Sequence, residues 1–335
     1  MKQKISILIP YYGKWPVYFG LFLNSCRNNE KVLDILFLTD IEKPKEVPAN
    51  VKFINLRFEE LKTIIRKKLN INIPDIPYYK LCDFRPLYGD IFEEYVKEYD
   101  FWGYGDIDLI YGNLNKYLTS EILDNYDVFA FRSDHLHGPF TIYRNSPFIN
   151  KLYSKCPFLN EILISENYLS FDEFGKSVVH ISLINGAELE SLPDDNITTI
   201  VLKEQANGNI RLYMNHSSKE RISGKDVIFI NNGCVTDYYS EQNYSFYHWV
   251  IEKRALYFKY PVWKIIPERF YVSSSGFYTD GEFRYYFLYN KYRKMKGICQ
   301  WYLLRLNNFI LRKRKRHIKI DTYPEPGFVK RMTSI

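Results

Sequence analysis

An α/β fold with a mainly parallel sheet is predicted by the order of apolar segments in the first part of the chain. Three short β-rich runs, at residues 5–10, 35–40 and 51–56, alternate with helical segments near 17–28 and 58–69. Strands that alternate with helices pair in parallel through right-handed crossovers. Ligands of such open sheets bind beyond the carboxyl ends of the strands, so we expect a site among the residues that follow these runs.

The rest of the chain predicts elements of both kinds. Apolar residues recur near the helical period from 81 to 99, with Pro86 in the first turn, and a second helix is expected at 249–258. The further strands expected are 127–131, 140–143, 198–202, 210–214 and 227–230. Together these segments predict a mixed, mainly parallel sheet flanked by helices over residues 1–258, with a basic and largely helical extension over 259–335.

Composition indicates a globular protein with a sizeable core, because 46% of the 335 residues are hydrophobic and 25% are charged. The N-terminus does not resemble a signal peptide, and the sequence has no run of 18 apolar residues. We therefore expect a cytoplasmic protein, either free or peripheral on the inner face of the cell membrane. The five cysteines are scattered without a Cys-x-x-Cys pair, which argues against a zinc site or a disulfide framework.

Positive charge is concentrated at the C-terminal end. Residues 281–335 contain 14 Lys and Arg against 3 Asp and Glu, whereas residues 1–280 contain 32 against 36. The segment 284–320 reads as one long helix or a pair of helices with apolar and basic residues. Such a helix can lie on an anionic membrane surface. The alternative is a helix that packs on the body and ends in a solvated basic run.

Asp106 and Asp108 are the strongest candidates for a functional site. They follow the aromatic run Phe101–Gly105, which reads as a buried strand, and they are separated by Ile107. Carboxylates in an apolar setting are costly unless something neutralises them. Mg²⁺ and Mn²⁺ take carboxylate, phosphate and water oxygens as ligands. The pair therefore predicts a divalent cation that carries a diphosphate.

Basic residues precede this pair at the start of the predicted helix. Lys80 and Arg85 lie some 20 residues upstream and could contact the diphosphate or the acidic pair, Arg bidentately. The alternative is that Asp83 and Arg85 cap and charge the helix terminus.

Tyrosines and an aspartate follow the first two predicted strands. Tyr11 and Tyr12 come after the first strand, and Asp40 ends the second. Aromatic rings stack on a nucleotide base, and a carboxylate binds ribose or base donors. For the two tyrosines, packing within the loop is the alternative.

These motifs together resemble the core of GT-A glycosyltransferases of the galactosyl- and mannosyl-transferring type. The resemblance rests on Lys80-x-x-Asp83-x-Arg85 followed by Gly103-Tyr104-x-Asp106-x-Asp108. A bacterial subgroup associated with capsule and lipopolysaccharide synthesis is similar in its opening, here Ile9-Pro10-Tyr11-Tyr12-Gly13-Lys14-Trp15-Pro16 with Phe37-Leu38-Thr39-Asp40 further on. The resemblance covers about residues 4–254. It departs from the wider pattern in that Arg85 follows Asp83 by two positions rather than three.

The resemblance implies a Rossmann-like GT-A domain that binds a nucleotide-sugar through one Mn²⁺ or Mg²⁺ ion. Asp106 and Asp108 would hold the cation, and His248 would be a third ligand, with a buried, hydrogen-bonded core histidine as the alternative. The residues implied in nucleotide-sugar binding are Pro10, Tyr11, Tyr12, Asp40, Lys80, Asp83, Arg85, Asp106 and Ile107.

Two later segments supply candidates for the sugar and the acceptor. The polar turn that contains His135, His137 and Gly138 could bind sugar or acceptor hydroxyls. Asp172 and Glu173 are adjacent carboxylates, of which one could orient an acceptor hydroxyl or act as a general base. The alternative is that these two carboxylates mark the start of a helix on the surface.

The leading prediction is thus transfer of a sugar from a nucleoside diphosphate to a hydroxyl of a glycan or lipid-linked glycan in bacterial surface polysaccharide synthesis. The resemblance suggests a retaining outcome, in which the leaving phosphate accepts the proton; an inverting outcome would require a base such as Asp172 or Glu173. A nucleic-acid-processing metal enzyme is a second class, which the net acidic body disfavours, so no nucleic-acid partner is expected. A third is a non-catalytic membrane-associated binding module.

Overall fold

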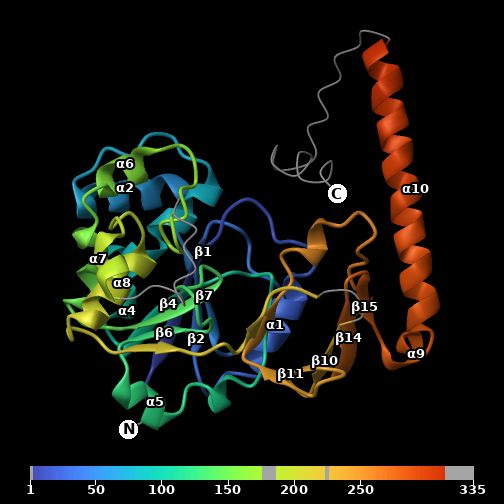
Figure 1. The fold of residues 1–335 in the computed structure, drawn as a ribbon, viewed down its shortest axis with the longest axis horizontal. Helices are drawn as coiled ribbons and strands as arrows, with labels where there is room; N and C mark the ends of the chain where they lie inside the picture. The colour runs from blue at the N-terminus through green and yellow to red at the C-terminus, as the bar shows by residue number, and fades with distance from the viewer. Residues whose placement is uncertain (1–2, 176–185, 223–225, 314–335) are drawn as a thin grey trace.

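A seven-stranded mixed sheet forms the centre of the protein in the computed structural model, which describes residues 3–175, 186–222 and 226–313 (Figure 1). The strand order is β3-β2-β1-β4-β7-β6-β8. Strands β3, β2, β1 and β4 are parallel, β7 is antiparallel to β4 and β6, and β8 is parallel to β6. The strands are β1 Ile5–Pro10, β2 Asp34–Thr39, β3 Val51–Asn55, β4 Phe101–Gly105, β6 Val128–Ala130, β7 Phe140–Arg144 and β8 Leu212–Met214.

Helical layers cover both faces of this sheet. Successive side chains of a strand point to opposite faces, so the apolar strands contribute to two cores. On β1, Ile7 belongs to one core and Leu8 to the other. The first core includes residues of α1 Phe19–Arg27, η2 Leu114–Lys116 and α5 Ser120–Asn125. The second includes residues of α2 Phe58–Leu69, the 3₁₀-helix η1 Tyr78–Leu87, α3 Tyr88–Ile91, α4 Glu93–Val96, η3 Ile149–Lys155, α6 Leu159–Ile164 and α8 Ile197–Ala206. Helix α7 Gly186–Ser191 precedes α8.

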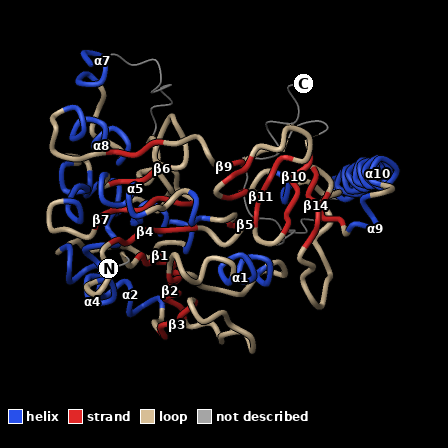
Figure 2. The backbone as a smooth tube through the Cα atoms, turned by 90° about the horizontal axis from the view of Figure 1, so that it is seen from below, coloured by secondary structure: helices blue, strands red, loops and turns tan. Residues whose placement is uncertain are grey.

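Two smaller sheets complete the body beside the large one (Figure 2). The five-stranded sheet has the order β12-β11-β10-β14-β15, with all its pairs antiparallel. Its strands are β10 Val227–Asn231, β11 Cys234–Asp237, β12 Asn243–Tyr244, β14 Arg269–Ser273 and β15 Gly276–Tyr278. The three-stranded sheet consists of β5 Leu109–Tyr111, β13 Phe246–His248 and β9 Ser218–Lys219. Strand β14 pairs with β10, so the five-stranded sheet contains residues from both sides of the predicted boundary at residue 258.

The described part of the chain ends in the short helix α9 Asp280–Phe283 and the long helix α10 Tyr286–Lys313. Figure 1 shows α10 at the edge of the molecule, extending beyond the body. The predicted long helix in 284–320 is confirmed as far as Lys313, and residues 314–320 lie outside the described residues. Among the helices that the structure describes, none combines the length and hydropathy needed to cross a bilayer.

Three predicted elements differ from the observed ones. The predicted helix 81–99 is instead three short pieces, η1, α3 and α4, and Pro86 lies inside the 3₁₀ segment rather than in the first turn of an α-helix. The predicted strand 198–202 belongs to helix α8, which Asn196 caps by accepting a hydrogen bond from the backbone N–H of Thr199. The predicted helix 249–258 contains only the single 3₁₀ turn η5 Glu252–Arg254.

Candidate functional site

The site lies where the large sheet meets the three-stranded sheet. Strand β1 has β2 on one side and β4 on the other, and the chain reaches β3 before it returns to β4, so β1 and β4 flank a point at which the strand order reverses. Such a switch point at the carboxyl ends of the strands is the usual ligand-binding position of open α/β sheets. Asp106 follows the end of β4, as predicted, and its backbone N–H donates to the Pro139 carbonyl.

The three-stranded sheet brings the other acidic and histidine side chains to this point. Asp108 directly precedes β5, and His248 ends β13, which pairs with β5. Glu220 follows β9, which runs parallel to β13 on its other side. The sheet therefore places Asp108, His248 and Glu220 next to one another, although they come from three distant parts of the sequence.

His248 faces the aspartate pair through one ring nitrogen and Glu220 through the other. Nδ1 contacts Glu220 Oε1 at 3.1 Å. Nε2 lies 3.4 Å from Asp108 Oδ2 and 3.8 Å from Asp106 Oδ2, and it is a buried atom without a hydrogen-bond partner among the described residues. Burial lowers the pKa of His248, but Asp108 and Glu220 outweigh it and raise that pKa to about 10. Without a bound metal, the imidazole ring of His248 is thus a cation.

Two further cations neutralise the aspartate pair. Lys253 Nζ lies 2.5 Å from Asp108 Oδ2, and Arg85 pairs with Asp106 through Nη2. Burial raises the pKa of Asp108, yet the charges of His248 and Lys253 prevail and hold it well below its usual range. Asp108 therefore stays ionised, as a metal ligand must be.

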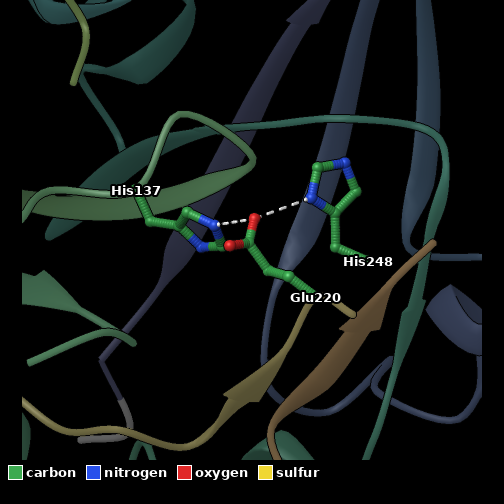
Figure 3. Close-up of side chains that lie close together, drawn as sticks. All are labelled: His137, Glu220 and His248. Atoms are coloured by element: carbon green, nitrogen blue, oxygen red, sulfur yellow. Dashed lines mark hydrogen bonds and ion pairs between the residues drawn. The ribbon is translucent and has the colours of Figure 1, made fainter. Parts of the chain in front are cut away.

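Glu220 is the centre of a second cluster, which Figure 3 shows with its carboxylate between two imidazole rings. Its Oε1 contacts His137 Nε2 at 2.6 Å and His248 Nδ1, and its Oε2 accepts from Arg132 Nη1. Burial raises the pKa of Glu220, but its hydrogen bonds with the two histidines reverse this and lower it. The pKa of His137 is lowered, chiefly by burial.

Two sets of side chains could hold a metal ion among the described residues, and they share His248. One is Asp106, Asp108 and His248; the other is His137, Glu220 and His248, and within each set the ligand atoms lie within 4.8 Å of one another. The first fits a hard cation better, because it offers two carboxylates and the unpartnered Nε2. The second offers a single carboxylate, that of Glu220, together with two imidazoles. An Mn²⁺ ion accepts an imidazole more readily than Mg²⁺ does.

The predicted carboxylates Asp172 and Glu173 lie on the Arg85 side of the site. Asp172 is fully buried and accepts from Arg85 Nη1 at 2.8 Å and from the Tyr168 hydroxyl at 2.7 Å. In this structure Asp172 holds Arg85 against Asp106, and no part of its side chain is exposed to an acceptor hydroxyl. Glu173 is less enclosed and accepts from the Gly138 N–H at 3.2 Å. Burial and the neighbouring Asp172 raise the pKa of Glu173 to about 8.

Gly138 leaves room for these charged groups to converge. A Cβ atom at this position would lie 2.7 Å from Glu173 Oε1, 2.8 Å from Asp172 Oδ2 and 3.0 Å from Arg85 Nη1. The predicted turn therefore does border the site. His135 lies there too, 6.1 Å from His137 between ring centroids, and burial lowers the pKa of His135 to about 4.

The residues predicted to contact the nucleotide have different positions. Tyr11 is half-buried and stacks on Trp15 with ring centroids 5.1 Å apart; burial and the charge of Asp108 raise its pKa. Tyr12 is buried against Phe58 and Tyr78, which is the packing alternative. The others near the first strand ends are the half-buried Pro10 at the end of β1, the exposed Asp40 after β2 and the buried Ile107 between the aspartates.

Lys80 and Asp83 form a buried structural pair, which contradicts the prediction that they contact a nucleotide-sugar. Both side chains have no exposed surface, and they pair at 2.7 Å. Lys80 Nζ also donates to the carbonyls of Ile162 and Asn167. Asp83 accepts from the backbone N–H groups of Leu169 and Phe171. The pair therefore fixes the chain that leads to Asp172.

Glu220 and Lys253 are site residues that the sequence did not reveal, whereas Arg132 begins the polar turn that contains His135 and His137. None belongs to a motif with the aspartate pair: Lys253 is 145 positions from Asp108. The one available signal was the proximity of Lys253 to His248 in sequence.

Fold and site define a mixed α/β protein with a candidate metal centre at the switch point of its sheet. The chain belongs to a family of unknown function, DUF6625, whose model matches residues 7–279. The match includes every residue of the site described above and ends before α9 and α10. The comparison with curated proteins found no match.

Proposed function

We propose that this protein is a metal-dependent glycosyltransferase that moves a sugar from a nucleoside diphosphate to a hydroxyl of a glycan acceptor. The observation that carries the proposal is the convergence of Asp106, Asp108 and the buried Nε2 of His248 beyond the end of β4. The strand order around β1 supports a GT-A fold, in which a nucleotide binds at the switch point. The motif resemblance supports a role in bacterial capsule or lipopolysaccharide synthesis.

The chemistry follows from the charges around the site. One Mn²⁺ ion held by Asp106, Asp108 and His248 would supply Lewis-acid stabilisation of the departing diphosphate. Binding of the cation requires a neutral His248 and therefore releases a proton. Lys253 and Arg85, which neutralise the two aspartates in this structure, are then placed to bind phosphate oxygens.

The protonation state of Glu173 is compatible with the proposed retaining outcome. With a pKa of about 8, its carboxyl group is largely protonated at neutral pH. A protonated Glu173 donates a hydrogen bond to an acceptor or sugar hydroxyl but does not accept a proton. In the proposed retaining transfer the leaving phosphate accepts the acceptor proton, so Glu173 is not required as the base.

Stabilisation by nucleotide-sugars tests the proposed function directly. Melting temperatures are measured with UDP-, GDP- and CMP-sugars, each with and without Mn²⁺. We expect one nucleotide-sugar to raise the melting temperature only when Mn²⁺ is present, because a ligand at 100 times its Kd adds about 2.7 kcal/mol of stability. Absence of a metal-dependent shift with every donor, together with salt-sensitive DNA binding, would instead support a nucleic-acid enzyme.

Glu220 is expected to position His248 for the metal. Its contact with Nδ1 directs Nε2 toward the aspartates, and loss of such an outer carboxylate typically weakens metal binding about 10–100-fold. We expect Glu220→Ala to show this loss in Mn²⁺ titration calorimetry, and Glu220→Gln to retain more affinity because it keeps an acceptor oxygen. The exposed Glu46→Gln is the charge-matched control. Unchanged Mn²⁺ affinity in Glu220→Ala would remove this role.

A further inference from the structure

Among the described residues, helix α10 contacts the body through side chains on one of its faces. Tyr286 is buried with its ring centroid 5.7 Å from that of Tyr278. Arg293 is also buried, with its guanidinium 4.1 Å from the centre of the Tyr278 ring. Gly297 lies so close to Tyr257 that a Cβ atom would be 2.5 Å from the Tyr257 Cβ. Positions 286, 293 and 297 share one helix face, which is therefore the body side of α10.

A continuous apolar stripe occupies the opposite face of the helix. Its positions follow one another at alternating steps of four and three, as expected for residues that line one side of a helix. All six side chains are exposed, and the large ones expose 57–70% of their surface. The 288–306 stripe consists of Leu288, Tyr292, Met295, Cys299, Tyr302 and Leu306. Figures 1 and 2 show α10 at the edge of the molecule beyond β14. The exposure of these side chains shows that the described residues of the body do not cover this face.

Positive charge flanks the stripe. Lys291, Lys294 and Arg305 lie on one side of it and Lys296 on the other, as helical geometry places them. The sequence of α10 has seven Lys and Arg and no Asp or Glu, and the last two of these begin the basic run 312–316. A helix with an exposed apolar stripe between basic residues matches the interface of a bilayer that contains anionic lipids.

We propose that the 288–306 stripe docks α10 on the surface of an anionic membrane. The helix would lie in the plane of the interface, since it lacks the hydropathy to cross a bilayer. Its stripe spans about 27 Å, at about 1.5 Å per residue. The heptad-like spacing also suits pairing with a second copy, but two such helices would bring Lys and Arg together on both flanks without any acidic partner. Charge therefore favours lipid over self-association.

Vesicle flotation of the full chain tests the docking surface. We expect binding to vesicles of phosphatidylcholine and phosphatidylglycerol at 7:3, weaker binding in high salt, and little binding to phosphatidylcholine alone. Leu288→Ser/Leu306→Ser removes apolar surface from the stripe, and Lys291→Glu/Lys294→Glu reverses charge beside it. Each pair should weaken binding to anionic vesicles at least tenfold.

Control variants show whether an effect on vesicle binding comes from the 288–306 stripe or from a change of charge elsewhere in the chain. Lys43→Glu/Lys45→Glu makes the same change of charge on an exposed loop of the body and should leave binding unchanged. Melting temperatures of all variants show whether the body remains folded. Equal vesicle binding by the stripe variants and the unmodified chain would overturn the proposal. A dimer that depends on the stripe, seen by light scattering in the absence of vesicle binding, would overturn it in favour of a second copy.

Discussion

Replacing Asp108 by Asn is expected to reduce Mn²⁺-dependent sugar transfer at least ~10³-fold. Asp108 is buried, kept ionised by His248 and Lys253, and is one of the two carboxylates that would hold the cation. Loss of the metal removes several kcal/mol of transition-state stabilisation. The measurement is initial rate of transfer from the donor identified by thermal shift, across a range of Mn²⁺ concentrations.

An exposed carboxylate provides the comparison for this variant. Asp124→Asn removes the same charge far from the site, where Asp124 accepts a hydrogen bond from Gln3, and should leave the rate unchanged. Circular dichroism reports whether Asp108→Asn keeps its fold. Full activity in the double variant Asp106→Asn/Asp108→Asn would show that the aspartate pair does not bind a catalytic metal.

Lys80→Met is expected to destabilise the protein by about 3–5 kcal/mol, because it leaves the buried Asp83 without its cation. The change also removes two donors from the carbonyls of Ile162 and Asn167. The free energy of unfolding from urea titration measures the effect. Lys52→Met is the matched control: its pair with Asp34 is partly exposed and should contribute about 0–1 kcal/mol.

The outcome for Lys80 also separates structure from nucleotide binding. If Lys80→Met lowers the free energy of unfolding by less than about 1 kcal/mol but strongly weakens nucleotide-sugar binding, Lys80 contacts the ligand after all. The buried geometry predicts the reverse, a large loss of stability, with lower activity only as a consequence of unfolding.

The parallel half of the fold could be predicted from sequence because its strands are short, continuous apolar runs. The runs at 5–10, 35–40 and 51–56 correspond to β1, β2 and β3, and the helix at 58–69 agrees with α2. Helix α8 was misread because Thr198, Ile200 and Val201 are β-branched residues, which favour strands, while the cap at Asn196 and tertiary packing decide for a helix.

The sequence could predict only those site residues that belong to a recognisable local motif. Asp106 and Asp108 stand out because carboxylates are costly in such an apolar setting, and His248 was inferred from the resemblance. Glu220 and Lys253 become neighbours of this pair only through the pairing of β9, β13 and β5. Lys80 and Asp83 were misplaced for a related reason: spacing along the chain does not show on which side of a helix the core lies.

The three-stranded sheet also assembles the candidate metal centre from remote parts of the chain. Asp108 lies in the first third of the sequence, whereas Glu220 and His248 lie in the last half. A cation bound there would tie these segments together, so its binding free energy would add to the stability of their association. Strand β13 would thus be needed to complete the candidate metal centre, and a chain that ends before β13 could not assemble it.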